Sequence, residues 1–314
     1  MTRHSQRGVA LVTAVVLVAL ATVIAVAIGS RSAMSARKSA GNLGYEQAVQ
    51  FAAGAEALAA YALHEDKGSQ DTLNESWARP YGPVEVGPGI TLEAQLGDEQ
   101  GKFNLNTLVN ARGEVDPDAL AVFTRLLKLL QLEPRWAPLL VDWIDSDVLP
   151  ASDGGEDSLY LSQQPPYRSA NLAITSISEL LQLPGFGRER FLKLAPHVTA
   201  LPLEASSINV CLASPVVLDA LNALASGGSQ NAVEYSLMDP KQLVDLRSKG
   251  CFPGATVMRG NLRPDVANRV GEASRYFRLQ SLISIGTARF ALYSLLKRDP
   301  DGQVRAVLRT LGTE

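Results

Sequence analysis

The stretch VALVTAVVLVALATVIAVAI, from Val9 to Ile28, decides how the N-terminal part of this chain folds, because its 20 residues carry no charge. At a helical rise of 1.5 Å per residue it spans roughly 30 Å, the thickness of a bilayer's hydrocarbon core. In lipid the backbone polar groups must be satisfied within the segment, so we expect a helix. A cleaved secretory signal has a shorter apolar region of about 7–15 residues. The stretch therefore favours a permanent membrane anchor.

The helix is predicted to continue beyond the membrane as far as about Leu63. Apolar residues recur there at spacings of three and four, which gives one face suited to packing on a soluble head. This face consists of Ala48, Phe51, Ala52, Ala55, Leu58, Ala59 and Ala62. The polar run from His64 to Gly68 then ends the helix. Residues 9–64 should form one rod, half in lipid and half against the head.

The rest of the chain alternates between strand patterns and helical patterns. Strands are expected around the Gly87–Gly89 turn and in three C-terminal runs, which are Tyr276–Ile285, Ala288–Lys297 and Gln303–Thr310. A long N-terminal helix on an antiparallel sheet is an α+β arrangement. Residues 65–102 and 274–314 should form this head. Helical patterns fill residues 103–273, at Asp118–Leu130, Ala137–Ile144, Ser176–Leu183, Arg188–Leu194, Pro215–Ala225, Pro240–Ser248 and Arg263–Val270.

Composition excludes several classes of function. The 314 residues carry a formal net charge of −3, so the chain is no general binder of polyanions. The three histidines include His4, ahead of the anchor, and no Gly-x-Ser-x-Gly, His-Glu-x-x-His or phosphate-loop motif occurs. The sequence therefore predicts no enzymatic activity.

An acidic segment between Val141 and Asp157 is the richest candidate site. It holds six carboxylates, Asp142, Asp145, Asp147, Asp153, Glu156 and Asp157. Crowded carboxylates repel one another unless a cation neutralises them. Oxygen ligands in a Gly-rich loop without His or Cys favour Ca²⁺, although the spacing is not that of an EF-hand. A solvated acidic loop is the alternative from spacing alone, and a glycosidase carboxylate pair is a remote one.

Two other features have structural and functional interpretations. Leu183–Gly187 has the apolar-x-Gly-apolar-Gly pattern of a helix-hairpin-helix turn, and Arg188, Arg190 and Lys193 follow it. Nucleic-acid binders concentrate more positive charge, which favours a structural turn. The two cysteines, Cys211 and Cys251, could close a loop by a disulfide or could be buried as thiols, and the sequence leaves both open.

The N-terminus resembles a type IV prepilin. A basic leader ending in Gly8 precedes the apolar stretch, and the resemblance implies cleavage after Gly8 and a mature N-terminus at Val9, which can be methylated. Most such proteins have Glu at mature position five, where this chain has Thr13. A buried Glu needs a cationic partner, normally the N-terminal amine of a neighbouring subunit, and Thr13 makes no such pair. The subunit that typically lacks this Glu is minor pseudopilin K of the type II secretion system.

The same family accounts for the helical insert. Gly101–Leu108 resembles the motif that leads into its helical domain, and the acidic segment resembles its Trp-x-Asp-x-Asp…Gly-x-Glu signature. The resemblance implies a pilin-like head whose insert has helix-hairpin-helix-like and sterile-alpha-motif-like subdomains. It also implies structural Ca²⁺ on Asp145, Asp147 and Glu156. Asp142 and Asp157 are further candidate ligands, and Asn171 offers an amide oxygen.

The resemblance further implies a place in the cell and partners. The chain should cross the bacterial inner membrane once, with its head in the periplasm, and should be processed by prepilin peptidase. Its partners should be minor pseudopilins I and J, with H as a further candidate, and the inner-membrane platform. The implied function is a non-enzymatic subunit at the tip of the pseudopilus. A membrane-tethered DNA receptor of a competence system and a type IV minor pilin are the alternatives.

Overall fold

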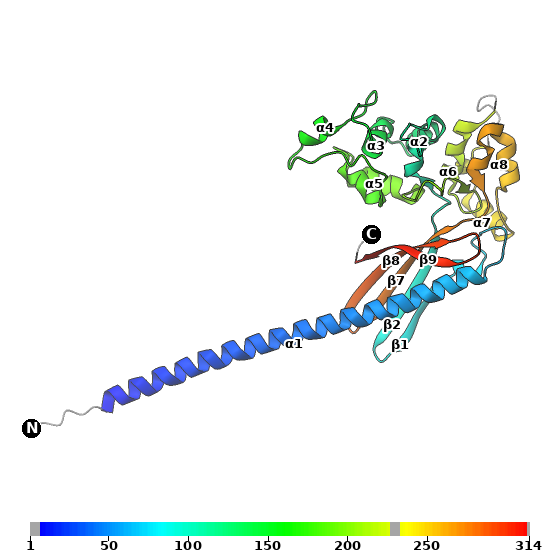
Figure 1. The fold of residues 1–314 in the computed structure, drawn as a ribbon. Helices are drawn as coiled ribbons and strands as arrows, with labels where there is room; N and C mark the ends of the chain where they lie inside the picture. The colour runs from blue at the N-terminus through cyan, green and yellow to red at the C-terminus, as the bar shows by residue number, and fades with distance from the viewer. Residues whose placement is uncertain (1–6, 227–232, 313–314) are drawn as a thin grey trace, which may run out of the picture.

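A computed structural model describes residues 7–226 and 233–312, so most of the leader expected at residues 1–8 lies outside the described residues. Helix α1, Arg7–Glu65, is one continuous element of 59 residues whose N-terminal half projects away from the rest of the molecule (Figure 1). Its apolar window has a mean hydropathy of 3.0 and is 0% buried, which makes it a candidate membrane span. The expected rod is present.

The C-terminal half of α1 packs on the head through small residues at helical spacing. Ala48, Ala52, Ala55 and Ala59 are buried, and Leu63 is fully buried at the end of this face. Small side chains let the helix axis approach the sheet closely, because little volume separates the two backbones. This contact orients the projecting N-terminal half of α1 relative to the head.

A five-stranded antiparallel sheet lies under α1, in the order β1-β2-β7-β8-β9. Its strands are β1 (Tyr81–Gly87), β2 (Ile90–Asp98), β7 (Tyr276–Ile285), β8 (Ala288–Arg298) and β9 (Val304–Leu311). Strands β2 and β7 pair along their whole length from Ile90↔Ile285 to Asp98↔Phe277, although the insert separates them in sequence. The α+β fold class predicted from the sequence is confirmed.

The insert forms a separate helical body above one end of the sheet (Figure 1). Its α-helices are α2 (Pro117–Leu129), α3 (Trp136–Ile144), α4 (Asp157–Leu161), α5 (Gly187–Leu194), α6 (Pro215–Leu221), α7 (Pro240–Ser248) and α8 (Ala255–Asn261). Its 3₁₀ turns include η2 (Leu105–Leu108), η3 (Ile177–Gln182), η4 (Ala195–His197), η5 (Asn222–Leu224), η7 (Tyr235–Leu237) and η8 (Pro264–Arg269), and η1 (Ser76–Ala78) lies in the head. Two short parallel pairs complete it, β3 (Phe103–Asn104) with β4 (Val198–Thr199), and β5 (Ile208–Asn209) with β6 (Val270–Gly271).

The sequence located most of these helices but misjudged some of their types. The segments expected at Ser176–Leu183 and Arg263–Val270 are 3₁₀ turns, and the short helices α4 and α8 had no predicted counterpart. A helical pattern of only six to eight residues does not distinguish a 3₁₀ turn from an α-helix, because tertiary contacts decide the hydrogen bonding of so short an element.

Cys211 and Cys251 form a disulfide with a Cα–Cα distance of 4.6 Å, which resolves the question that the sequence left open. The bond joins the segment after β5 to the loop between α7 and α8. It closes a loop of about 40 residues at the base of the insert.

We expect the double replacement Cys211→Ser and Cys251→Ser to lower the free energy of unfolding by about 2–4 kcal/mol, because the unfolded chain then gains the freedom of that loop. Chemical denaturation of the full-length chain in detergent, with and without a reductant, measures this. Reductant should destabilise the native chain and leave the double variant unchanged. Equal stability of the two proteins without reductant would contradict the prediction.

Candidate functional site

The acidic loop starts where α3 ends. Helix α3 is almost wholly buried, because seven of its nine residues are apolar and the insert surrounds them. Asp145 caps the helix with an extended backbone (φ −69°, ψ 167°), and the chain then runs as an irregular loop to Glu156, the residue before α4. Helix α3 therefore fixes the position of the first acidic residue.

Three carboxylates of this loop meet at one point. Asp145, Asp147 and Glu156 each offer an oxygen within 4.8 Å of the others. Asp145 and Glu156 are only 5% exposed, whereas Asp147 faces solvent. Burying two carboxylates side by side is costly unless a positive charge compensates them. These three are the residues that match the family's acidic signature.

Several oxygens around this point lack a hydrogen-bond donor. Among the described residues none donates to Asp145 Oδ1 or Glu156 Oε1, although both atoms are buried. Asn171 Oδ1 is a third such acceptor, and the Asn171 side chain is held beside the loop by donating to the Asp147 carbonyl oxygen at 2.8 Å. Unpaired buried acceptors are rare in folded proteins and indicate a missing donor or cation. The set consists of hard oxygens, which is the chemistry that Ca²⁺ prefers.

The acid–base properties of the loop agree with this interpretation. Burial, together with the neighbouring charges of Asp147, Asp142 and Glu156, raises the pKa of Asp145 from 3.8 to about 7. Burial also raises the pKa of Glu156, against the lowering effect of a hydrogen bond from Ser169. At neutral pH the site therefore favours either protons or a bound cation.

Asp142 and Asp157 lie outside the cluster of three and support the loop instead. Asp142 accepts hydrogen bonds from the Ala151 N–H at 3.0 Å and the Gly155 N–H at 2.7 Å. A Cβ at Gly154 would clash with Asp142 Oδ2, so this turn requires glycine. Asp157 accepts from the Ser169 N–H at 3.3 Å and pairs with Arg168 at 3.4 Å. The carboxylates predicted as extra ligands thus already have donors.

A second acidic group, near the end of α1, has no need of a metal. Asp66, Asp71 and Glu75 lie within 4.8 Å of one another, but Arg298 donates to both aspartates and the Thr72 N–H donates to Glu75. In this cluster the protein itself supplies a partner to each carboxylate.

The helix-hairpin-helix-like turn serves the insert's own packing. Gly185 and Gly187 have φ angles of 80° and 71°, which other residues rarely adopt. Arg190 donates to the Phe186 carbonyl at 3.1 Å and to Glu133 Oε1 at 2.8 Å, and its guanidinium lies over the ring of Trp136. The central basic side chain is therefore engaged within the protein, which supports the structural interpretation.

Two asparagines explain the Gly101–Leu108 motif. Asn106 bonds both backbone groups of Ile174, accepting from its N–H and donating to its carbonyl at 2.9 Å, and also donates to the Leu201 carbonyl. Asn104 accepts from the Leu201 N–H at 3.0 Å. Both side chains are almost fully buried, so the motif joins the start of the insert to segments far along the chain.

Known proteins resemble this chain over almost its whole length. A family model described as type II secretion system (T2SS), protein K, matches residues 101–203. The type II secretion system protein K of Pseudomonas aeruginosa is 35% identical over 99% of this chain and 94% of its own length. That of Klebsiella pneumoniae is 35% identical over 78% of this chain and 76% of its own length.

A solved structure has the same fold. One chain of the GspK-GspI-GspJ complex from the enterotoxigenic Escherichia coli type 2 secretion system superposes with a TM-score of 0.67 at 25% identity. The match covers 88% of this chain and 100% of that chain. The acidic loop, the asparagine motif and the hairpin turn all lie within residues 101–203, the range of the family model.

Proposed function

This chain belongs to the type II secretion system protein K family, and on that premise we propose that it is the non-enzymatic minor pseudopilin at the tip of the pseudopilus. It would initiate and cap assembly and so support protein export across the outer membrane. The observation that carries this proposal is the combination of an exposed apolar α1 with a head enlarged by the helical insert. An exposed apolar helix can pack against the helices of other subunits in a polymer. A head enlarged by the insert fits at the end of the polymer, where no subunit lies above it.

The residue at position 13 supports a terminal place in the polymer. The Thr13 hydroxyl donates to the Ala10 carbonyl at 3.0 Å within α1, so it is a neutral side chain satisfied by its own helix. It carries no charge that would need the N-terminal amine of a subunit above it. A cleaved chain would still offer its own amine to the acid of a subunit below. The subunit can therefore receive neighbours on one side only.

The proposed partners are minor pseudopilins I and J, with H as a further candidate, and the secretion platform of the inner membrane. The structural relative was solved as a GspK-GspI-GspJ complex, which supports the first two. We also propose a single pass through the inner membrane with the head in the periplasm, where the disulfide can form. No nucleic acid is involved in this proposal.

Structural Ca²⁺ on Asp145, Asp147 and Glu156 is part of the proposal. The unpaired buried oxygens of Asp145 and Glu156 support it, because a cation at the cluster would satisfy both, and Asn171 Oδ1 is a further unpaired oxygen beside the loop. When bound, Ca²⁺ would supply positive charge that fixes the loop in one conformation. The protein's own role is to preposition the oxygens, through α3 and through the turn that Asp142 holds.

Processing of the N-terminus provides the first test. We expect the chain isolated from membranes to begin at Val9 and the Gly8→Leu variant to retain Met1, because the peptidase needs the small residue before the cut. Mass spectrometry of the N-terminal peptide measures this. Gly29→Ala is the matched control in the same helix, where a Cβ meets nothing within 4 Å, and it should be processed normally.

Labelling of the filament provides the second part of the same test. Antibody against the insert should mark one end of isolated pseudopili in the native strain and no filaments in the Gly8→Leu strain. Retention of Met1 by the native chain, or label along the whole filament, would overturn the proposal. Duplex DNA binding by the purified chain that weakens with salt would favour the competence receptor instead.

A further inference from the structure

The head and the insert have separate hydrophobic cores. The largest cluster of buried residues contains only insert residues, from Phe103 to Val270, whereas the core under α1 contains only residues of α1, β2, β7 and β8. Few apolar residues connect the two bodies. A small cluster of four joins Leu201 and Ala205 to Tyr276 and Leu295, and Leu212 packs against a second head cluster.

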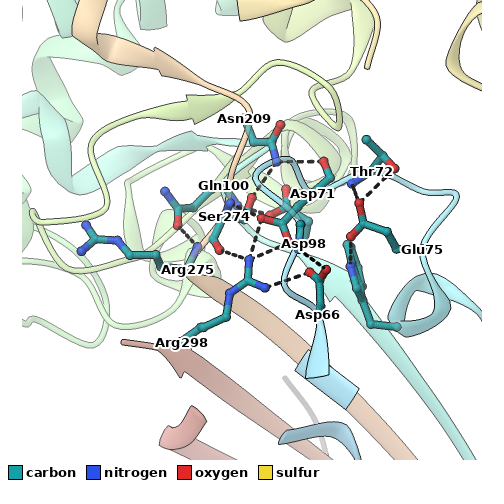
Figure 2. A network of polar contacts seen from close by, with 12 residues as sticks. Asp66, Asp71, Thr72, Glu75, Asp98, Gln100, Asn209, Ser274, Arg275 and Arg298 are labelled. Carbon is teal, nitrogen blue, oxygen red and sulfur yellow. Dashed lines mark hydrogen bonds and ion pairs between the residues drawn. The ribbon is translucent and has the colours of Figure 1, made fainter. Parts of the chain in front are cut away.

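Polar contacts complete the junction, among them an ion pair between Glu204 of the insert and Lys297 of β8. One network of such contacts surrounds Arg298, the last residue of β8 (Figure 2). Its guanidinium donates to Asp66 at 2.9 Å and to both carboxylate oxygens of Asp71 at 2.6 Å. It also donates to the Ser274 carbonyl at 2.8 Å. One side chain of the sheet therefore holds the segment after α1 and the segment that leaves the insert.

Asp71 extends this network toward the insert. Its backbone N–H donates to the Glu272 carbonyl at 2.7 Å, and its carboxylate accepts from the Ser274 N–H at 2.6 Å. Asp71 is only 1% exposed, so its charge depends on these partners. Without Arg298 the carboxylate would keep the Ser274 N–H but would be buried without a compensating positive charge.

The insert itself reaches the network through Asn209 and Gln100. Asn209, fully buried in β5, donates to the Asp71 carbonyl at 3.2 Å and to the Ser274 hydroxyl at 2.8 Å. Gln100 lies where the chain enters the insert, and its side chain accepts from the Arg275 N–H at 2.6 Å. The chain passes between head and insert twice, through the crossing segments Asp98–Gly101 and Gly271–Tyr276. Both crossing segments take part in this set of contacts.

We propose that Arg298 is a latch that holds the insert at a fixed angle to α1, and that without it the insert rotates about its two crossing segments. Two bodies joined by a small apolar contact move relative to each other unless directional bonds prevent it. The hydrogen bonds of a planar guanidinium are directional in this sense, because each requires a defined geometry at the oxygen that accepts it. The latch concerns the orientation of the insert and does not depend on the proposed role in secretion.

The test is a distance measurement on the full-length chain in detergent. Spin labels are placed at Glu93→Cys on β2 and Lys128→Cys on α2, both exposed, with the native disulfide intact. Pulsed electron resonance then gives the distribution of distances between head and insert. We expect one narrow peak in the native background and a broadened or shifted distribution with Arg298→Ala.

Arg309→Ala is the matched control, because Arg309 also pairs with a carboxylate, Glu56 of α1, but does not contact the insert. Its distribution should stay narrow. If Arg298→Ala does not fold, Arg298→Lys decides, since lysine keeps the charge but cannot span Asp66, Asp71 and Ser274. A native distribution in the folded Arg298 variant, or equal broadening in Arg309→Ala, would overturn the proposal.

Discussion

Replacing Asp145 by alanine should abolish the stabilisation of this chain by Ca²⁺. In the native chain a Ca²⁺ concentration about a thousandfold above Kd should raise the free energy of unfolding by ~4 kcal/mol, because the ion binds the folded loop and not the unfolded chain. Asp145 is buried and supplies an unpaired oxygen to the cluster. Its replacement therefore removes one negative charge and one positioned oxygen ligand. Thermal unfolding of the full-length chain in detergent, with Ca²⁺ titrated against a chelator, measures the shift.

Asp153→Asn is the control for this experiment. Asp153 belongs to the same loop but lies outside the group of three, and its φ of 64° is one that asparagine tolerates. This variant should keep the full Ca²⁺ shift. The ligand assignment is wrong if Asp145→Ala and Asp153→Asn respond alike, or if Ca²⁺ does not change the stability of the native chain.

The pH dependence without Ca²⁺ follows from the same site. Because the folded-state pKa of Asp145 is raised from 3.8 to about 7, the folded chain binds more protons than the unfolded chain between these values. This contribution to stability is present at low pH and is lost as pH rises toward 7. Chelator-treated native chain should therefore lose stability across that window, and Asp145→Ala should lose less. Added Ca²⁺ should stabilise more at pH 8 than at pH 5, since protons compete for the same oxygens.

Asn106→Ala should destabilise the insert by about 3–5 kcal/mol, because each buried backbone group left without a partner costs about 1–3 kcal/mol. The replacement leaves the Ile174 N–H and carbonyl without their side-chain partner. It also removes one of two donors to the Leu201 carbonyl, which Asn104 still reaches at 3.0 Å. Denaturant unfolding followed by tryptophan fluorescence measures it, since all three tryptophans are buried and two of them, Trp136 and Trp143, lie in the insert.

Asn110→Ala is the matched control four residues further along. The Asn110 side chain bonds Arg112 and Glu114 in an exposed turn, where water can replace the lost contacts. We expect a cost below about 1 kcal/mol. Comparable losses for Asn106→Ala and Asn110→Ala would show that the buried contacts do not hold the insert together.

The sequence predicted the elements whose patterns are long and regular. Helix α1 follows from its uncharged stretch and its alanine face, and strands β7, β8 and β9 follow from alternation within one or two residues of their observed ends. Asp145, Asp147 and Glu156 were also predicted as ligands from the acidic signature, and the structure brings these three together. In each case neighbouring residues in the sequence carry the signal.

The candidate site needed the fold for its remaining parts. Asn171 comes from a different segment, and the position of its unpaired oxygen depends on a hydrogen bond to the Asp147 carbonyl. Asp142 looks like a ligand in the sequence, and only the turn at Gly154 and Gly155 shows that backbone N–H groups occupy its oxygens. Composition reveals acidic residues but does not reveal which of them already have donors.

The sequence by itself therefore determined the long apolar N-terminal helix, the α+β head, the helical insert and the acidic loop, because periodicity and charge are patterns that neighbouring residues form. The tertiary structure alone decided that β2 pairs with β7 across the insert, that Cys211 meets Cys251, and that Arg298 joins the end of α1 to the base of the insert. These contacts link residues between 40 and more than 200 positions apart, and their energies depend on burial and direction, which no local pattern encodes.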